Sequence, residues 1–357
     1  MDLDLDDEQE LFRETAAKFL ADRWPISAVR ALIGDRGGFN HDIWKQAAEL
    51  GWTSLLVPED LGGSLSGAGV RDLAIIAEES GQALVAGPLL PTNIVAFALG
   101  QDPMSELAQA HLPEIAAGRE LAAWVSRPDA VRVESSGDGY RLTGTAGPVQ
   151  DAHVADYLLV TAGRTQFLVP AGTRGLAVEL LDGLDLSRRY GRVRFDGALV
   201  PAAARVGAGG AELDAQLGLA LALQCAETVG AARVAYAMTL RYVKERKAFG
   251  RPIGSYQALK HRLAEMLLWL ESAQAVTSAA VAAVQADRDG LTAARTAKAY
   301  VADRLPALVR DCLQMHGGVG YTWEHDLHLF LRRVETNAEI YGGAAHQLGA
   351  LAPVIGF

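Results

Sequence analysis

Four residues in the last third of the sequence are suited to binding a phosphate-bearing ligand. Arg246 is always charged and can form paired hydrogen bonds to phosphate oxygens. Gly317 and Gly318 would let backbone N–H groups come close to a phosphate, because no Cβ stands in the way. Gln314 can donate and accept hydrogen bonds toward a ribose or a base edge. Taken singly, Arg246 is equally typical of a solvated helix face, and the glycine pair of an ordinary turn.

The overall composition limits the class of protein. The chain has 357 residues, 50% of them hydrophobic, which is enough for two or three hydrophobic cores. Its formal net charge of −10 makes nucleic acid and anionic membrane poor partners, because both reward basic patches. Cys225 and Cys312 stand far apart without a CxxC motif, so neither a metal site nor a disulfide framework is predicted.

The two most informative segments for localisation are the start of the chain and its longest apolar stretch. Residues 1–7 are acidic, unlike a secretory or mitochondrial targeting peptide. The apolar stretch near residues 217–240 contains Gln224 and Glu227 and falls short of a membrane-spanning helix. A cytoplasmic protein without a membrane segment is therefore expected.

The elements that must position these residues change in type along the chain. Residues 1–118 have helical spacing of apolar residues, with helices expected from residue 6, over 40–50 and over 68–83. Residues 119–210 contain short β-type runs separated by turns, which favours a small antiparallel barrel or sandwich. Residues 211–357 are helical again, with long segments expected over 212–245, 255–286 and 291–315 and a final shorter one.

Two long motifs resemble the acyl-CoA dehydrogenase family. The first is YVKERKAFGRPIGSYQ at residues 242–257, and the second is QMHGGVGYTWEHD at residues 314–326. Their order and separation match the family, and PEDLGG at residues 58–63 fits it too. The resemblance implies an α+β fold with an N-terminal helical domain (1–118), a middle β-barrel or sandwich domain (119–210) and a C-terminal four-helix bundle domain (211–357).

The resemblance also implies a cofactor, a substrate and partners. The cofactor is FAD, bound between subunits, and the substrate is an acyl-CoA thioester. The electron acceptor is an electron-transferring flavoprotein, and the assembly is an oligomer, typically a tetramer. FAD-binding residues on one subunit would face those of a neighbour: Arg246, Phe249 and Gln257 opposite Gln314, Gly317 and Gly318. Tyr321, Trp323 and His325, in contrast, are predicted to serve packing.

The base that the family's reaction requires is missing from both usual positions. A carboxylate removes the proton α to the thioester while a hydride leaves the β carbon for the flavin. Gly342 stands where most members have this Glu, and Ala220 stands at the alternative position on an earlier helix. Glu227 and Glu339 are the nearby acids that could replace it, although neither is expected to reach the same point in space.

The middle of the chain also departs from the family pattern. Residues 126–132 read SRPDAVR where the family has a Gly- and Ser-containing loop, and residues 148–151 read PVQD in place of Trp-Ile-Thr-Asn. Ala344 replaces a Thr that the family uses for its cofactor. The residues that would hold the flavin ring are therefore lost, whereas those for the adenine and phosphate end are kept.

Three hypotheses remain open. The first is the subunit of a heteromeric acyl-CoA dehydrogenase that lacks its own base and shares FAD with, or leaves it mainly to, a sister subunit. TWEHDLH at residues 322–328 resembles the actinobacterial steroid side-chain branch of such enzymes. The second is an active homotetramer that acts on an acyl-CoA or an acyl carrier through an unrecognised base. The third is a binding or scaffold protein without redox chemistry.

Overall fold

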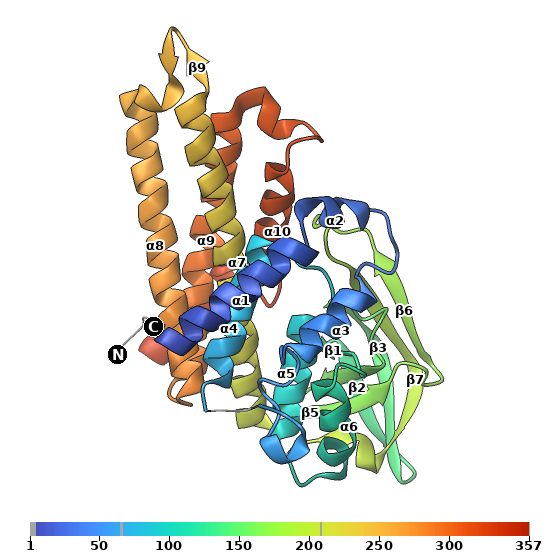
Figure 1. The fold of residues 1–357 in the computed structure, drawn as a ribbon. Coiled ribbons are helices and arrows are strands. Elements are labelled where there is room, and N and C mark those ends of the chain that lie inside the picture. Colours follow the sequence, from blue (N-terminus) through green and yellow to red (C-terminus); the bar gives the residue numbers. More distant parts are fainter. Residues whose placement is uncertain (1–4, 65–66, 208, 357) are drawn as a thin grey trace.

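The computed structural model describes residues 5–64, 67–207 and 209–356, so the acidic residues 1–4 lie outside the described part. Figure 1 shows an upright helical bundle on one side and the β-strands on the other, with the N-terminal helices between them. The predicted domain borders near residues 118 and 210 stay a prediction. Residue 118 follows the last N-terminal helix, and residue 210 begins the longest helix of the bundle.

The N-terminal part is helical, as the apolar spacing predicted. Asp6 begins α1 with a reciprocal capping box to Gln9, and Asn40 begins α3 by accepting from two backbone N–H groups. Helix α5 is buried on nearly all sides, so it has no amphipathic pattern that would have marked it in the sequence. The helices are α1 (Asp7–Arg23), α2 (Ile26–Ala31), α3 (His41–Glu49), α4 (Gly69–Gln82), α5 (Leu89–Gly100) and α6 (Glu106–Ala116), with a 3-10 turn, η1 (Glu59–Leu61).

The middle part consists of two four-stranded sheets, in the orders β1-β4-β5-β8 and β2-β3-β7-β6. One expectation was wrong: β1 pairs with β4 in parallel, with Ala122 opposite Tyr157, so the domain is not wholly antiparallel. Phe167 and Phe195 are buried in a core separate from that of the helices. The strands are β1 (Ala122–Val125), β2 (Val131–Ser136), β3 (Gly139–Gln150), β4 (Tyr157–Ala162), β5 (Thr165–Pro170), β6 (Leu176–Leu181), β7 (Tyr190–Pro201) and β8 (Arg205–Val206).

The C-terminal part is a bundle of long helices around α7. A short hairpin, β9–β10, projects beyond the ends of α7 and α8 at the top of the bundle (Figure 1). The final expected helix is in fact two helices, α10 and α11, separated by a corner at residues 340–343. The elements are α7 (Gly210–Glu245), β9 (Lys247–Ala248), β10 (Arg251–Pro252), η3 (Ile253–Ser255), α8 (Gln257–Gln285), α9 (Gly290–His316), η4 (Gly317–Tyr321), α10 (Leu327–Glu339), α11 (Ala344–Leu351) and η5 (Ala352–Ile355).

Two glycines allow α4 to cross α7 at close range. A Cβ on Gly81 would lie 1.9 Å from the backbone oxygen of Glu227, and a Cβ on Gly230 would lie 2.0 Å from that of Glu78. Any side chain at either position would force the helices apart. The N-terminal helices are therefore fixed directly against the central helix of the bundle.

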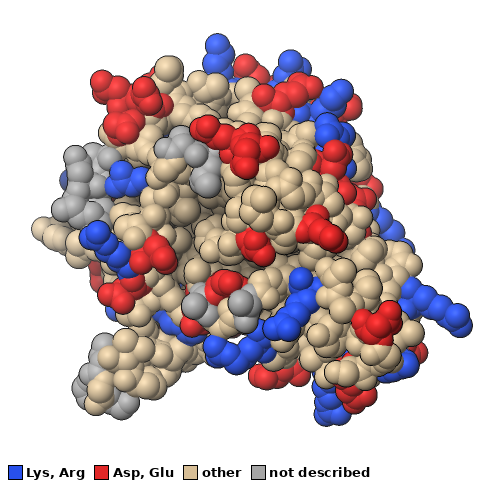
Figure 2. All heavy atoms as spheres, turned by 90° about the horizontal axis from the view of Figure 1, so that it is seen from below, with Lys and Arg blue, Asp and Glu red and all other residues tan. Residues whose placement is uncertain are grey.

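Two helices, α7 and α8, are long and apolar enough to cross a membrane by length and composition alone. The expectation that the stretch 217–240 falls short of a membrane-spanning helix is therefore too strict. However, 83% of the apolar window of α7 is buried inside the protein, as in a core helix. Only 28% of the window of α8 is buried, so α8 presents an apolar outer face. Figure 2 shows basic and acidic side chains interspersed on the face that it displays.

Candidate functional site

The first three predicted FAD-binding residues lie around the β9–β10 hairpin. Arg246 directly follows α7, where its N–H donates to the backbone oxygen of Tyr242 over 2.8 Å. Phe249 lies at the tip of the hairpin in the left-handed region, with φ of 52° and 96% of its surface exposed. Gln257 is the exposed first residue of α8. An aromatic side chain so exposed contributes little to this chain's own core.

The other three predicted residues lie at the end of α9. Gln314 is exposed in its last turn, and Gly317 ends the helix with φ of 61°. A Cβ at Gly317 or Gly318 would meet no atom within 4 Å. Packing within the chain therefore does not require glycine at Gly318. The open space is what close approach of a ligand to the backbone would need.

A stacked pair of rings joins the two motifs. The ring of Tyr242 lies 4.4 Å from that of His316, with 23° between the planes, and its hydroxyl donates to the backbone oxygen of His316 over 3.3 Å. Burial lowers the pKa of His316, which favours its neutral form in this stack. The two motifs, more than fifty residues apart in sequence, are thereby held at the same end of the bundle.

This end of the bundle has the kinds of groups that the adenine and phosphate part of FAD would need. Among the described residues, the side chains of Arg246, Gln257 and Gln314 have no hydrogen-bond partner or ion pair, so their donors and acceptors are available. Arg246 supplies the fixed cation that a pyrophosphate needs. The N–H of Gly317 donates to the backbone oxygen of Gln314, and no atom lies within 4 Å of the point where a Cβ would stand on Gly318.

The aromatic residues beside this end differ from expectation. Tyr321 and Trp323 are 65% and 52% exposed, so the predicted packing role is wrong for Tyr321. Trp323 packs at the surface, stacked on His328 at 5.2 Å between ring centroids. His325 is half-buried against His316, as a packing role requires.

Neither usual base position has a carboxylate or the space for one. Gly342 has φ of 95°, and a Cβ there would lie 2.4 Å from the ring of His346. A glutamate at this corner would need both a strained backbone and a displaced histidine. Ala220 is 1% exposed and lies in the core of the bundle.

Glu227 is fully buried and all its acceptor positions face donors. Its Oε2 accepts from Arg188 Nη1 over 2.9 Å and from Asn337 Nδ2 over 2.8 Å, and its Oε1 accepts from Arg333 Nη1 over 3.1 Å. Burial acts to raise the pKa of Glu227, but the charges of Arg188 and Arg333 lower it below its ordinary value. Such a carboxylate stays ionised and held in place, which argues against a proton acceptor.

The ion pairs of Glu227 belong to a network that joins all three parts of the chain. Arg333, fully buried on α10, donates to Asp185 Oδ2 over 2.5 Å and to the backbone oxygen of Val85 over 3.2 Å. Arg188 donates to the same backbone oxygen of Val85 over 3.3 Å. No sequence signal pointed to this network, because an arginine in a polar run is more typical of the surface.

Glu339 lies beside the corner between α10 and α11. It is exposed, and a Cβ on Gly343 would be 3.2 Å from each of its carboxylate oxygens. The carboxylate therefore lies next to the backbone of Gly343, one residue from Gly342. Of the two acids considered as substitutes, only Glu339 keeps a carboxylate open to solvent near this corner.

Buried side chains of this chain lie beside the stretches to which the resemblance assigns the flavin ring. Trp124, at the end of β1 near residue 126, lies 5.5 Å from the ring of Tyr341, and its Nε1 donates to Thr161 Oγ1 over 3.0 Å. Gln166 Nε2 donates to Thr161 Oγ1 over 3.1 Å and to Gln216 Oε1 over 2.8 Å, which extends the contact to α7. As they stand, these residues do not fit a flavin ring.

Asp151 closes the same region from the PVQD stretch. It is fully buried with φ of 51°, and its Oδ1 has no hydrogen-bond partner among the described residues. Burial raises the pKa of Asp151 more than the nearby Arg188 lowers it. Sequence reasoning missed Trp124 and Tyr341, because each lies next to a motif position; it named Asp151 as part of the PVQD stretch but not its burial.

Comparison with known proteins agrees with this geometry. Residues 6–119 match the family described as acyl-CoA dehydrogenase, N-terminal domain, and residues 211–352 match acyl-CoA dehydrogenase, C-terminal domain. The chain is 32% identical to acyl-CoA dehydrogenase IpdE2 of Mycolicibacterium smegmatis, over 97% of this chain and 98% of that protein.

Solved structures show the same likeness over the whole chain. The ChsE4-ChsE5 complex of Mycobacterium tuberculosis has a chain that is 27% identical, with a TM-score of 0.91 and 99% of both chains covered. A chain of the Tcur3481-Tcur3483 steroid ACAD G363A variant is 26% identical, with a TM-score of 0.90 and 98% of both chains covered. FAD is the cofactor of these family neighbours. The chain belongs to the acyl-CoA dehydrogenase family.

Proposed function

We propose that this chain is the subunit of a heteromeric, FAD-dependent acyl-CoA dehydrogenase that lacks its own catalytic base and works with a sister subunit. The observation that carries the proposal is the state of its carboxylates. Gly342 and Ala220 have none, and Glu227 is locked between Arg188 and Arg333. We infer that a partner takes the α proton, because no carboxylate stands at either usual base position and Glu227 is held ionised.

The contrast between the two halves of the cofactor site supports a division of labour. When bound, FAD supplies the hydride acceptor of the reaction. The adenine and phosphates would be held across a subunit interface, with Arg246, Phe249 and Gln257 of one subunit facing Gln314 and the backbone at Gly317–Gly318 of a neighbour. The sister subunit would supply the ring-binding residues and the glutamate.

Relatives suggest the substrate class and the partners. Two structurally similar chains come from assemblies named as a ChsE4-ChsE5 complex and as a Tcur3481-Tcur3483 steroid ACAD. We infer a CoA thioester of a steroid side chain as substrate and an electron-transferring flavoprotein as acceptor. The assembly would be a heterotetramer, in which the apolar outer face of α8 packs against another subunit.

Co-production with the acyl-CoA dehydrogenase-like product of an adjacent gene tests the proposal. We expect the chain alone to be flavin-poor and inactive, and the pair to purify together with flavin absorbance and acyl-CoA dehydrogenation. Efficient turnover by the purified single chain would contradict it. An assembly without flavin would instead favour a binding or scaffold role.

Arg246→Ala tests the assignment of the phosphate cation. Removing the guanidinium leaves phosphate charge unpaired, so FAD binding to the complex should weaken by about 2–4 kcal/mol. Arg241→Ala is the control, because Arg241 is an exposed arginine on the same helix, outside the motif. Equal flavin content in both variants would make Arg246 an ordinary surface residue.

A second candidate function rests on Glu339, whose carboxylate lies beside Gly343. If this acid moved toward the corner when substrate binds, the chain would be an active homotetramer acting on an acyl-CoA or an acyl carrier. Glu339→Gln should then abolish turnover by the single chain. Turnover that is absent from the single chain, or unchanged by the substitution, removes this candidate.

A further inference from the structure

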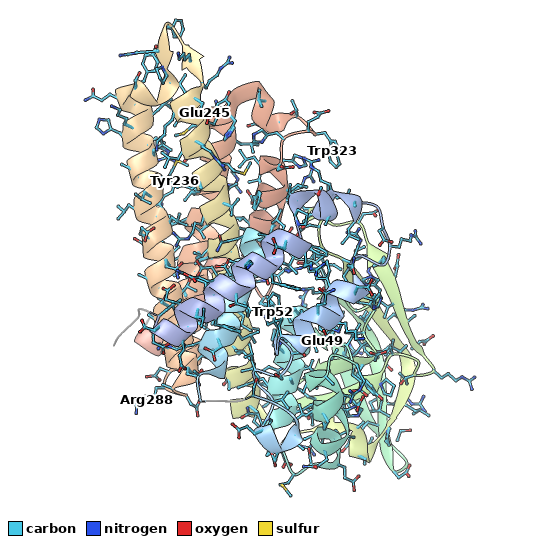
Figure 3. The ribbon with its side chains drawn as sticks, in the orientation of Figure 1. Glu49, Trp52, Tyr236, Glu245, Arg288 and Trp323 are labelled. Carbon is cyan, nitrogen blue, oxygen red and sulfur yellow. The ribbon has the colours of Figure 1, made fainter. Side chains whose placement is uncertain are left out.

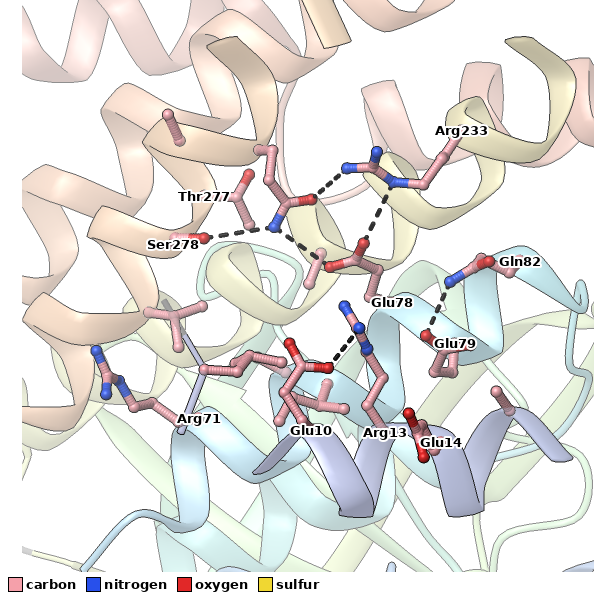
Figure 4. Close-up of a pocket in the computed structure, with 18 of the residues that line it drawn as sticks. Glu10, Arg13, Glu14, Arg71, Glu78, Glu79, Gln82, Arg233, Thr277 and Ser278 are labelled. Carbon is pink, nitrogen blue, oxygen red and sulfur yellow. Dashed lines mark hydrogen bonds and ion pairs between the residues drawn. The ribbon is translucent and has the colours of Figure 1, made fainter. Parts of the chain in front are cut away.

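A charged cleft lies on the opposite side of the N-terminal helices from the β-sheets. It has a volume of about 960 Å³ and lies between α1, α4, α7 and α8 (Figure 4). None of the residues predicted to bind FAD lines it. The cleft therefore needs an explanation apart from the function proposed above.

The cleft has more carboxylates than cations. Its described lining includes five glutamates and three arginines: Glu10, Glu14, Glu78, Glu79 and Glu271, with Arg13, Arg71 and Arg233. Arginines of the cleft already pair with its glutamates. Arg13 pairs with Glu10, and Arg233 lies between Glu78 and Glu271 at 3.6 and 3.5 Å.

Glu79 is the buried member of this set. It is 7% exposed, has no ion pair among the described residues, and accepts one hydrogen bond, from Gln82 Nε2 over 2.9 Å. Burial, and next the charge of Glu78, raise the pKa of Glu79 to about 7, whereas Arg13 and Arg233 lower it less. A buried carboxylate at this pKa gains strongly from an added cation.

Thr277 is a second unsatisfied group in the same cleft. Its side chain lines the cleft from α8 and the residue is 2% exposed, yet its Oγ1 has no hydrogen-bond partner. A buried hydroxyl without a partner is unusual and costs free energy. It can accept a hydrogen bond from an N–H donor in the cleft, independently of the acids.

The chemistry of the lining selects the kind of cation. Among the described residues, no group of three or more His, Cys, Asp or Glu side chains could hold a metal ion. The excess of two carboxylates, the volume of about 960 Å³ and the unpartnered hydroxyl suit a molecule with two separated charges and N–H donors. We propose that this cleft binds an organic dication with ammonium or guanidinium groups, which pairs with Glu79 and donates to Thr277.

Calorimetric titration of the full-length protein with agmatine tests the proposal. Binding should be roughly tenfold weaker at pH 6 than at pH 8, because Glu79 is mostly neutral at the lower pH. Other charged groups also face the cleft and could change the binding of agmatine with pH: Glu10, Glu14, Glu78 and Glu271, together with Arg13, Arg71 and Arg233. The affinity for agmatine is therefore measured at pH 6 and at pH 8 for each variant.

Variants distinguish binding at Glu79 and Thr277 from non-specific attraction of agmatine to an acidic protein. Glu79→Gln keeps the size of the side chain and should weaken agmatine binding at pH 8 at least tenfold and remove its pH dependence. Thr277→Val should weaken it severalfold. Glu49→Gln changes an exposed acid outside the cleft on α3 and should leave binding unchanged, and magnesium chloride should not compete. Agmatine binding that is absent, or equal in wild type and Glu79→Gln, overturns the proposal.

The same titration identifies the source of the cation. One agmatine bound per chain, without a change of assembly, indicates a free ligand. If a Lys or Arg of a neighbouring chain fills the cleft instead, agmatine should dissociate the assembly, and Glu79→Gln alone should weaken it. Both outcomes are independent of flavin content, so they do not depend on the function proposed above.

Discussion

The charged residues at the end of the bundle around Arg246 are exposed, whereas those in the interior around Glu227 are buried and paired. Arg246 is an exposed cation without a partner among the described residues, and its neighbours Phe249 and Gln314 are also exposed. Glu227 is completely buried and is paired with two arginines and an asparagine of the same chain. A charge already satisfied within the chain serves the fold, and one left free can serve a ligand.

The comparison explains how residues predicted for the adenine and phosphate part of FAD can be kept while those for the flavin ring are lost. Buried arginines and carboxylates need each other, so the network at Val85, Arg188 and Arg333 holds three parts of the chain together. Trp124 and Tyr341 fill the space beside it. The open end needs no such contacts, because a sister subunit and FAD would cover it in the proposed assembly.

The largest expected effect is that of breaking the closed region. Arg333→Met removes a fully buried cation and leaves Asp185 and Glu227 with fewer partners. The free energy of unfolding should fall by about 3–5 kcal/mol, measured by urea denaturation. Arg310→Met, which removes an arginine that is 62% exposed and pairs with Glu335, should cost less than about 1 kcal/mol. Equal effects would mean that the buried charges do not hold the closed region together.

The carboxylate of Glu79 sharpens the comparison, because it is buried without the cations that Glu227 has. Its pKa of about 7 lies above the ordinary 4.5, so its contribution to stability is full below pH 4.5 and is lost as the pH rises through 7. Glu79→Gln does not titrate.

The difference in the free energy of unfolding between Glu79→Gln and wild type should therefore shift with pH. It should be more favourable to the variant at pH 8 than at pH 4, by up to about 3 kcal/mol. Urea denaturation at the two pH values measures this. A difference that does not change with pH would place the pKa of Glu79 near its ordinary value.

Trp124→Phe tests the closure of the ring region on a smaller scale. The variant keeps an aromatic ring but loses the hydrogen bond from Nε1 to Thr161. A loss of about 1–2 kcal/mol of stability is expected by denaturation. Trp323→Phe, at a position that is 52% exposed, should stay within about 0.5 kcal/mol. If both variants behave alike, Trp124 does not seal this region.

The smallest effect on the folding of the chain is expected at the open end. Phe249 is 96% exposed, so Phe249→Ala should change the free energy of unfolding of the isolated chain by less than about 0.5 kcal/mol. Flavin retention in the co-produced complex should nevertheless fall, because Phe249 would contact the cofactor there. A destabilised chain with normal flavin content would reverse the assignment.

The sequence anticipated the helical and β regions wherever the local signals were strong. Caps at Asp6 and Asn40 and the apolar period of α4 gave helices close to their observed bounds. It did not resolve α5, which is buried all round and has no amphipathic pattern. It also missed the parallel pairing of β1 with β4, because strand direction depends on contacts between residues far apart in sequence.

The candidate site was predictable to a similar extent. Continuous motifs supplied the six predicted FAD-binding residues, and the structure places both motifs at one end of the bundle, while their role in binding FAD stays a prediction. No motif pointed to Arg188, Arg333 or Glu79, because the significance of each depends on its burial and partners. Figure 3 shows the side chains of the described residues on the ribbon, with Tyr236 and Glu245 on α7 far from Glu49 on α3.

The sequence by itself determined which chemical groups this protein has and which it lacks. It names the family through two motifs, has at Arg246 a cation that could pair with a phosphate, and has no carboxylate at Gly342 or Ala220. Only the tertiary structure decided which of the remaining acids are available. Folding pairs Glu227 with arginines and leaves Glu79 without an ion pair among the described residues. The physical reason is that the charge state of a carboxylate depends on its solvation and on cations a few ångströms away, and these come from distant parts of the chain.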